Sequence, residues 1–185
     1  MEINLAEATD YLLKRSEGAE ELRHDKNQII SHYEKSIAFV ESLAIITEEQ
    51  WRTPIEPGKW TVAEVIGHLT PWDEFVLHQR LPFLFIEESL PKGPPVEEMN
   101  ASAARNSRVQ SKEETIANFI NQRHQLMNAL HPIDDKQWQQ SFKIGTTELT
   151  LHGYFASLVD HDLHHFSQIK KVLKNEEAIK WISSI

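Results

Sequence analysis

The feature that most constrains the fold is a long amphipathic run near the end of the chain, from about Leu151 to Leu173. No glycine or proline interrupts this run after Gly153. Its apolar residues recur at three- and four-residue spacing: Tyr154, Phe155, Leu158, Phe166, Ile169, Val172 and Leu173. This spacing predicts one long helix whose apolar face has to be buried against other elements.

Two histidines lie toward the apolar side of this predicted helix. At about 100° per residue, His161 and His165 fall toward the apolar face, whereas Asp160 and His164 lie on its flank or point away. Imidazoles one turn apart can place their nitrogens about 2.0–2.1 Å from one ion without bending the helix. The pair is therefore half of a divalent-metal site, and His68 is the best candidate for a third ligand.

The segment around His68 predicts a second helix with a well-defined start. Thr61 is the expected N-cap, and Glu64 completes a capping box with it, so we interpret Glu64 as a cap rather than a catalyst. Trp60 and Val65 form a hydrophobic staple. A lone histidine at the edge of an apolar face is usually structural. The histidine pair expected in the same small core favours a ligand role for His68.

This second helix is predicted to extend to about Ile86. Pro71 and Pro82 would each clash with the carbonyl four residues earlier, so kinks or interruptions are expected there. Trp72 and Phe75 lie close to the candidate ligand. They are most simply core residues, and the alternative is that they wall a pocket for an apolar substrate.

Two more amphipathic segments predict long helices, at residues 20–46 and 111–130. Shorter helical segments are expected at 1–18, 47–54, 134–138 and after 174. Residues 142–149 predict a small hairpin or loop before the last long helix. Residues 96–110 are polar and carry no clear helical pattern.

The two halves of the chain share an order of long helix, short acidic turn ending in Gln-Trp, connector, Thr and long helix. The spacing from Trp51 to Trp138 nearly equals that from Thr61 to Thr150. The match is too weak to prove duplication. It favours two αα-hairpins related by a pseudo-twofold, which is an all-α four-helix bundle with short extra helices.

Composition narrows the class of protein. A length of 185 residues predicts a single domain, 1–185, and apolar and charged shares of 40% and 25% are typical of soluble globular proteins. The net charge of −9, with scattered Lys and Arg, argues against nucleic acid as a partner. No apolar run approaches the roughly 20 residues that span a bilayer, and the first residues lack a signal-peptide pattern. We therefore expect no membrane partner and a cytoplasmic location.

The chain contains no cysteine. Disulfides, thiolate nucleophiles and cysteine-ligated zinc are all excluded by this absence. Any metal has to be held by histidine, carboxylate and water.

The motif residues resemble a known family. The pattern Trp-Thr-x-x-Glu-x-x-x-His-Leu from Trp60 to Leu69, followed by His161-x-x-His164-His165-x-x-Gln168-Ile169, resembles the DinB-like superfamily, especially its YfiT-like branch. The resemblance covers residues 20–174 and implies a four-helix bundle with a three-histidine site for zinc or nickel. Matched by motif, the ligands are His68, His161 and His165.

The resemblance also implies an activity. Members of the YfiT-like branch are described as metal-dependent hydrolases, and some relatives are transferases or isomerases that use bacillithiol, mycothiol or glutathione. Homodimers are common among them. This chain has Phe166-Ser167 where the wider family commonly has Arg-Gly before Gln168. Retention of all three histidines argues against the metal-free relatives of the colibactin-resistance group.

Three imidazole ligands leave at least one coordination position of the metal open, as in catalytic sites. An ion in such a site can lower the pKa of its bound water to roughly 7, or it can bind a thiol and activate it as the thiolate. Asp162 is a candidate base or orienting residue, Asp73 is another, and Gln168 is a candidate contact to the open position. The leading hypothesis is a metal-dependent enzyme acting on a small molecule, either a bacillithiol-type S-transferase or a hydrolase. The alternatives are a non-catalytic protein that binds a metal or a toxic small molecule, and a vestigial site.

Overall fold

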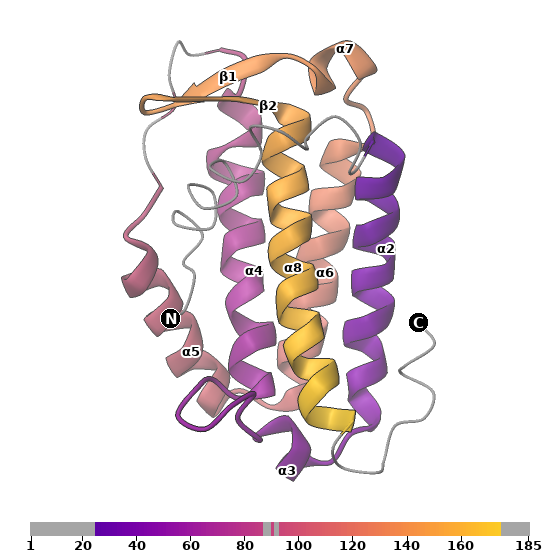
Figure 1. Ribbon diagram of the computed structural model, residues 1–185, viewed down its shortest axis with the longest axis vertical. Coiled ribbons are helices and arrows are strands. Elements are labelled where there is room, and N and C mark those ends of the chain that lie inside the picture. The colour runs from indigo at the N-terminus through magenta and orange to yellow at the C-terminus, as the bar shows by residue number, and fades with distance from the viewer. Residues whose placement is uncertain (1–24, 87–89, 91–92, 175–185) are drawn as a thin grey trace.

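The computed structural model describes residues 25–86, 90 and 93–174, so the helical segments expected at 1–18 and after residue 174 lie outside the described residues. Its main body is a bundle of long helices (Figure 1). These are α2 (Lys26–Ser42), α4 (Val62–Gln79), α6 (Lys112–Leu130) and α8 (Leu151–Lys174). The predicted four-helix bundle is confirmed.

α2 and α4 stand at diagonal corners of this bundle, and so do α6 and α8, whereas α4 and α6 are neighbours. α4 packs against α6, α6 against α2, and α2 against α8, while α8 closes the ring against α4 through the loosest of the four contacts (Figure 1). The prediction of two αα-hairpins is therefore wrong. The connections at 43–61 and 131–150 are long enough to cross an end of the bundle diagonally, whereas antiparallel neighbours are joined by short loops.

Each long connection contains a short helix, and the two lie at opposite ends of the bundle (Figure 1). These helices are α3 (Glu48–Trp51) and α7 (Asp135–Trp138). Both begin with a capping box, in which the side chain of Thr47 or Asp134 accepts from a backbone N–H three residues later. Both end in a buried tryptophan, Trp51 or Trp138. The repeated Gln-Trp turns therefore close the two ends of the core.

A helix that the sequence pattern does not predict, α5 (Val96–Val109), packs along α4. Its buried residues are Ala103, Ala104 and Ser107, so it has no large apolar stripe. A close approach to α4 depends on Gly67, because a β-carbon at that position would lie 1.8 Å from Ser107 Oγ. α5 and α4 therefore pack through small residues. Without large apolar residues at helical spacing, the sequence of α5 carries no amphipathic pattern from which a helix could be predicted.

The start and end of the helix that carries His68 differ in how well the sequence predicts them. Thr61 caps α4 by accepting from the Glu64 N–H, as expected. Pro71 lies inside the helix. The helix ends at Gln79, short of the predicted Ile86, and Pro82 lies in a 3₁₀ turn that follows. The expected interruption at the second proline is confirmed.

The predicted hairpin precedes the last helix. β1 (Ser141–Ile144) and β2 (Thr147–Thr150) pair antiparallel, with Gly145 at a positive φ of 60° in the turn. Thr150 Oγ1 then accepts from the Gly153 N–H at 3.0 Å, which satisfies one of the free donors at the start of α8. The hairpin thereby fixes where α8 begins.

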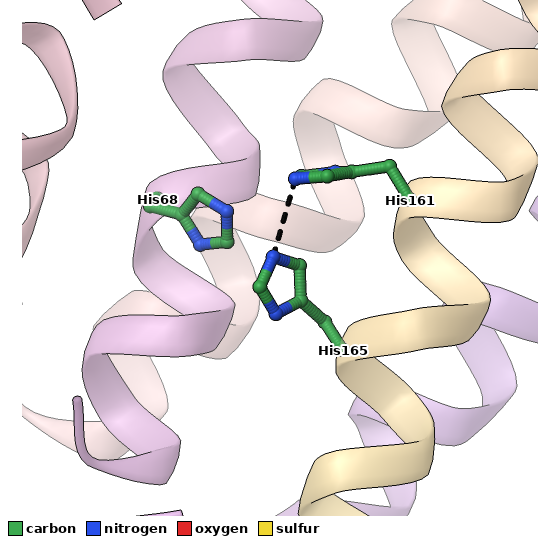
Figure 2. Close-up of side chains that lie close together, drawn as sticks. All are labelled: His68, His161 and His165. Atoms are coloured by element: carbon green, nitrogen blue, oxygen red, sulfur yellow. Dashed lines mark hydrogen bonds between the residues drawn. The ribbon is translucent and has the colours of Figure 1, made fainter. Parts of the chain in front are cut away.

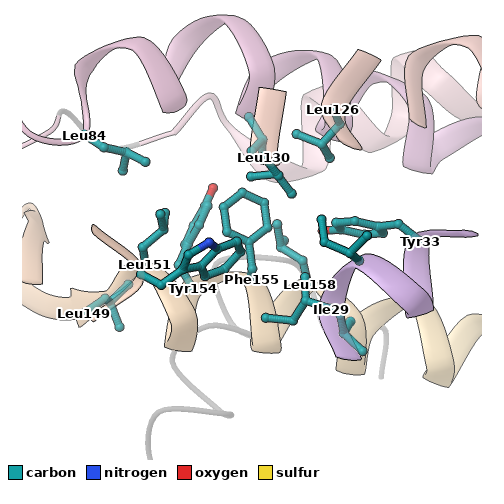
Figure 3. Packing of buried hydrophobic residues seen from close by; sticks show 14 of the residues in the cluster. Ile29, Tyr33, Leu84, Leu126, Leu130, Leu149, Leu151, Tyr154, Phe155 and Leu158 are labelled. Carbon is teal, nitrogen blue, oxygen red and sulfur yellow. The ribbon is translucent and has the colours of Figure 1, made fainter. Parts of the chain in front are cut away.

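The buried apolar residues form two clusters along the bundle axis. The first lies toward the hairpin and contains Tyr33, Leu126 and Phe155 (Figure 3). The second lies toward α3 and contains Phe119 and Phe166. Buried polar residues lie between the two clusters. The candidate metal ligands lie at the same height along the bundle axis. Among the described helices, none combines the length and hydropathy needed to traverse a bilayer.

Candidate metal centre

Three histidines meet across the seam between α4 and α8 (Figure 2). His68 comes from α4, and His161 and His165 come from successive turns of α8. One ring nitrogen from each lies within 4.8 Å of the others. The ring centroid of His68 is 5.5 Å from that of His161 and 4.6 Å from that of His165. The structure therefore brings together the three residues that the sequence motifs single out.

The spacing of these nitrogens suits a divalent ion. The Nε2 atoms of His161 and His165 are 3.2 Å apart. Two nitrogens about 2.0–2.1 Å from a tetrahedral ion would be separated by about 3.3–3.4 Å. One ring nitrogen of His68 lies within 4.8 Å of a ring nitrogen of each of the other two. The group could hold one metal ion.

Two of the rings are held by hydrogen bonds through their other nitrogen. His68 Nδ1 donates to the carbonyl oxygen of Val65 at 2.6 Å, and His165 Nδ1 donates to Gln168 Oε1 at 2.9 Å. Donation from Nδ1 leaves the lone pair of each ring on Nε2. These contacts select the tautomer that a metal needs and fix the orientation of the rings.

Burial keeps the three imidazoles neutral. Burial, reinforced by the other two histidines, lowers the pKa of His68 well below its usual value. Burial likewise lowers the pKa of His161 to about 3 and that of His165 to about 4. All three rings are therefore unprotonated at neutral pH, which is the form that binds metal.

A buried polar cluster adjoins the histidines and includes a residue from each long helix. Arg123 of α6 donates to Asp73 of α4 at 2.7 Å and to Asp162 of α8 at 2.5 Å. His32 of α2 donates to Asp162 at 3.0 Å. The Arg123 guanidinium also lies 4.6 Å from the ring centroid of Tyr33. This cluster fixes the four helices relative to one another at the level of the candidate ligands.

The two carboxylates of this cluster differ in acidity. Burial raises the pKa of Asp73 to about 7, with Arg123 opposing the increase and Asp162 adding to it. Burial also disfavours ionised Asp162, but the Arg123 charge and the His32 hydrogen bond outweigh it and lower the pKa of Asp162. Asp162 is thus an anion engaged by two donors.

Other residues that the sequence singles out have structural contacts. Glu64 accepts from Thr61 and Arg108 and caps its helix. Trp72 is buried and donates to Asn100 of α5 at 2.8 Å. The Arg80 guanidinium lies 4.6 Å from the ring centroid of Phe75.

Comparison with known proteins places this fold in a family. The sequence profile of the DinB superfamily matches residues 28–169. The chain belongs to the DinB superfamily. Among solved structures, this DinB-superfamily chain is similar to YfiT from Bacillus subtilis, described as "a probable metal-dependent hydrolase with an unusual four-helix bundle topology". The TM-score is 0.70 at 22% identity, over 82% of this chain and 87% of YfiT, a likeness that shows the shared fold. No match is found among curated proteins.

Sequence reasoning misses the centre of the polar cluster. Arg123 is 1% exposed, and nothing in the sequence analysis assigns it a role. A signal exists, because Arg123 lies between Phe119 and Leu126 on the apolar stripe of α6, where a charge requires partners. His32 is a second residue that the sequence motifs do not single out, and it is partly buried and contacts Asp162.

Proposed function

We propose that this DinB-superfamily protein is a divalent-metal-dependent enzyme acting on a small molecule, with His68, His161 and His165 as the ligands. The observation that carries the proposal is the convergence of three neutral imidazoles from two helices, with nitrogens within 4.8 Å of one another. Imidazole donors suit zinc, nickel, copper and iron, and the family resemblance implies zinc or nickel among these.

A divalent ion on three neutral imidazoles supplies a Lewis acid with an open position, able to activate water or a thiol. The chain's own residues prepare that position. The Val65 carbonyl and the Gln168 amide keep the Nε2 lone pairs of His68 and His165 available. Trp60 packs with its ring centroid 5.0 Å from that of His68 and shields it.

Asp162 and Gln168 act in this proposal as positioning residues. Asp162 directly follows His161, and its oxygens accept from Arg123 and His32, so it anchors the turn of α8 that presents the ligand. Gln168 orients His165 in the same way. Residues that orient metal-binding histidines commonly alter metal affinity 10- to 100-fold.

Hydrolysis is the reaction that the likeness to YfiT favours, because that protein is described as a probable metal-dependent hydrolase. Thiol-dependent S-transfer, of bacillithiol type, uses the same ligand set. The two reactions differ in whether a low-molecular-weight thiol is required. They are separated by assaying ester hydrolysis without a thiol and conjugation of monochlorobimane with and without one.

The ligand set is tested first by elemental analysis of the purified protein. We expect about one divalent ion per chain, lost in His161→Ala and retained in His164→Ala. His164 is a matched control because it is an exposed neighbour outside the three-histidine group. Equal metal content in both variants would contradict the proposed ligands. Metal without turnover in either assay would leave a metal-binding protein and contradict the enzymatic part.

A further inference from the structure

A groove lies on the flank of α8 away from the histidines, between that helix and α2. Its volume is about 620 Å³, within the range of roughly 300–1,000 Å³ that is typical of small-molecule sites. At about 100° per residue, Leu163, Ser167 and Lys170 lie on the side of α8 opposite His161 and His165. This groove is therefore separate from the candidate metal centre.

Lysines surround the groove. Lys35 on α2 and Lys170, Lys171 and Lys174 on α8 all line it. Among the described lining residues none is acidic, although the chain as a whole carries a net charge of −9. Two carboxylates pair with lining residues from outside the groove: Glu56 lies 3.8 Å from Lys171 in an exposed pair, and Asp162 accepts from His32 at 3.0 Å. The groove is a local concentration of positive charge on an acidic protein.

Helix stability accounts for only part of this charge. Lysines in the last turn of a helix interact favourably with its dipole, which explains Lys171 and Lys174. Like charges at i and i+4, as at Lys170 and Lys174, destabilise a helix. Lys35 lies in the middle of α2, where the dipole offers nothing, and it faces the same groove.

The floor of the groove is apolar and aromatic. The rings of Phe39 and Phe166 pack with centroids 4.6 Å apart, and His32 stacks on Phe166 at 6.3 Å. Lys170 Nζ lies 5.2 Å from the centroid of the Phe39 ring, so its alkyl stem crosses this floor. Leu163 adds an apolar side chain that is 47% exposed. An occupant thus meets apolar surface below and ammonium groups around the edge.

We propose that the groove between α2 and α8 binds a small amphipathic organic acid free in solution, with its apolar body on Phe39 and Phe166 and its carboxylate among the lysines. The volume suits a single small molecule. A bare inorganic anion would leave the aromatic floor uncovered, and a cation would face four ammonium groups.

The test is a calorimetric titration of the full-length protein with decanoate, in parallel with decyltrimethylammonium and inorganic phosphate. We expect saturable decanoate binding that weakens as salt is raised, because salt screens the lysines. Neither the cationic amphiphile nor phosphate should bind comparably. Comparable binding of either one, or no decanoate binding, would overturn the proposal.

Two independent variants locate the site. Lys170→Gln with Lys174→Gln should weaken decanoate binding about tenfold or more, because two of the four ammonium groups that attract the carboxylate are lost. Ser167→Trp should block the groove. Lys136→Gln with Lys143→Gln removes the same charge at exposed positions near the hairpin and should leave binding unchanged. Unchanged binding in both groove variants would sink the assignment.

A membrane surface is the main competing partner for a lysine-rich face. Sedimentation with anionic phosphatidylglycerol vesicles distinguishes it. Vesicle binding without saturable binding of free decanoate would overturn the proposal in favour of a lipid surface. None of these measurements depends on the metal centre, so the groove and the proposed enzyme function can fail separately.

Discussion

Arg123 donates a hydrogen bond to Asp162 at 2.5 Å, and Asp162 directly follows the candidate ligand His161 in α8. The guanidinium is 1% exposed and also binds Asp73. A single cation therefore compensates two buried carboxylates from two helices. The orientation of the metal-facing turn of α8 depends on this arrangement.

Removal of the cation should be costly. We expect Arg123→Met to lower the free energy of unfolding by about 3–5 kcal/mol, because it leaves two buried carboxylates without their partner. Urea denaturation measures the change. Adding Asp73→Asn and Asp162→Asn should recover much of the loss. Arg105→Met, at an exposed position of α5, should change stability by less than about 0.5 kcal/mol. Equal effects at the two arginines would contradict this account.

Asp73 should give the protein a specific pH dependence. Its pKa is raised to about 7 in the fold, against about 3.9 in an unfolded chain. The folded state therefore holds the proton more tightly, so this contribution to stability is full below about pH 4 and is lost as the pH rises through 7. Asp73→Asn removes it.

Urea denaturation of the wild type and Asp73→Asn from pH 4.5 to 8 tests this dependence. The stability of the wild type minus that of the variant should fall with rising pH, by at most about 1.4 kcal/mol per unit. Taking the difference cancels the contributions of titrating groups that do not interact with Asp73. A difference that stays constant over this range would show that Asp73 does not titrate there.

Gly67 should be required for the packing of α5. A β-carbon there would lie 1.8 Å from Ser107 Oγ and 2.9 Å from Ser107 Cβ. We expect Gly67→Ala to destabilise the protein by about 1–3 kcal/mol despite its better helix propensity. In a double-mutant cycle, Ser107→Gly should relieve the clash, so the two substitutions together should cost less than their sum. Additive effects would show that the contact is unstrained.

Gln168 should tune the proposed metal site without being a ligand. We expect Gln168→Leu to weaken metal affinity about 10- to 100-fold, because His165 loses the acceptor that fixes its tautomer. Competition with a chromogenic chelator measures the affinity. Ser167→Ala, the exposed neighbour, is the control. If Gln168→Leu binds the metal as tightly as the wild type, Gln168 has no role in the metal site.

The candidate metal ligands can be predicted from the sequence more readily than the packing of the helices around them. His161 and His165 lie on the apolar side of an uninterrupted helical pattern, so their common direction follows from the helical period alone. The capping box at Thr61 similarly predicts the start of the helix that carries His68. Local chemistry and short-range periodicity are sufficient for such features.

The missed features depend on contacts between distant segments. α5 buries alanine and serine against Gly67, which leaves no periodic signal in its own sequence. Arg123 lies on an apolar stripe, but its partners come from the neighbouring α4 and the diagonally opposite α8, and their positions depend on the diagonal crossing of the connections. A pattern read one helix at a time does not contain that information.

The diagonal order of the helices also has a consequence for how the protein is made. His68 lies in the first half of the chain, and its two counterparts lie in α8, more than ninety residues later. During synthesis, a chain that ends before α8 would present only His68, because the helix that carries the other two histidines is not yet made. Metal capture would then report completion of the bundle, since the ion can engage all three rings only after α8 has docked.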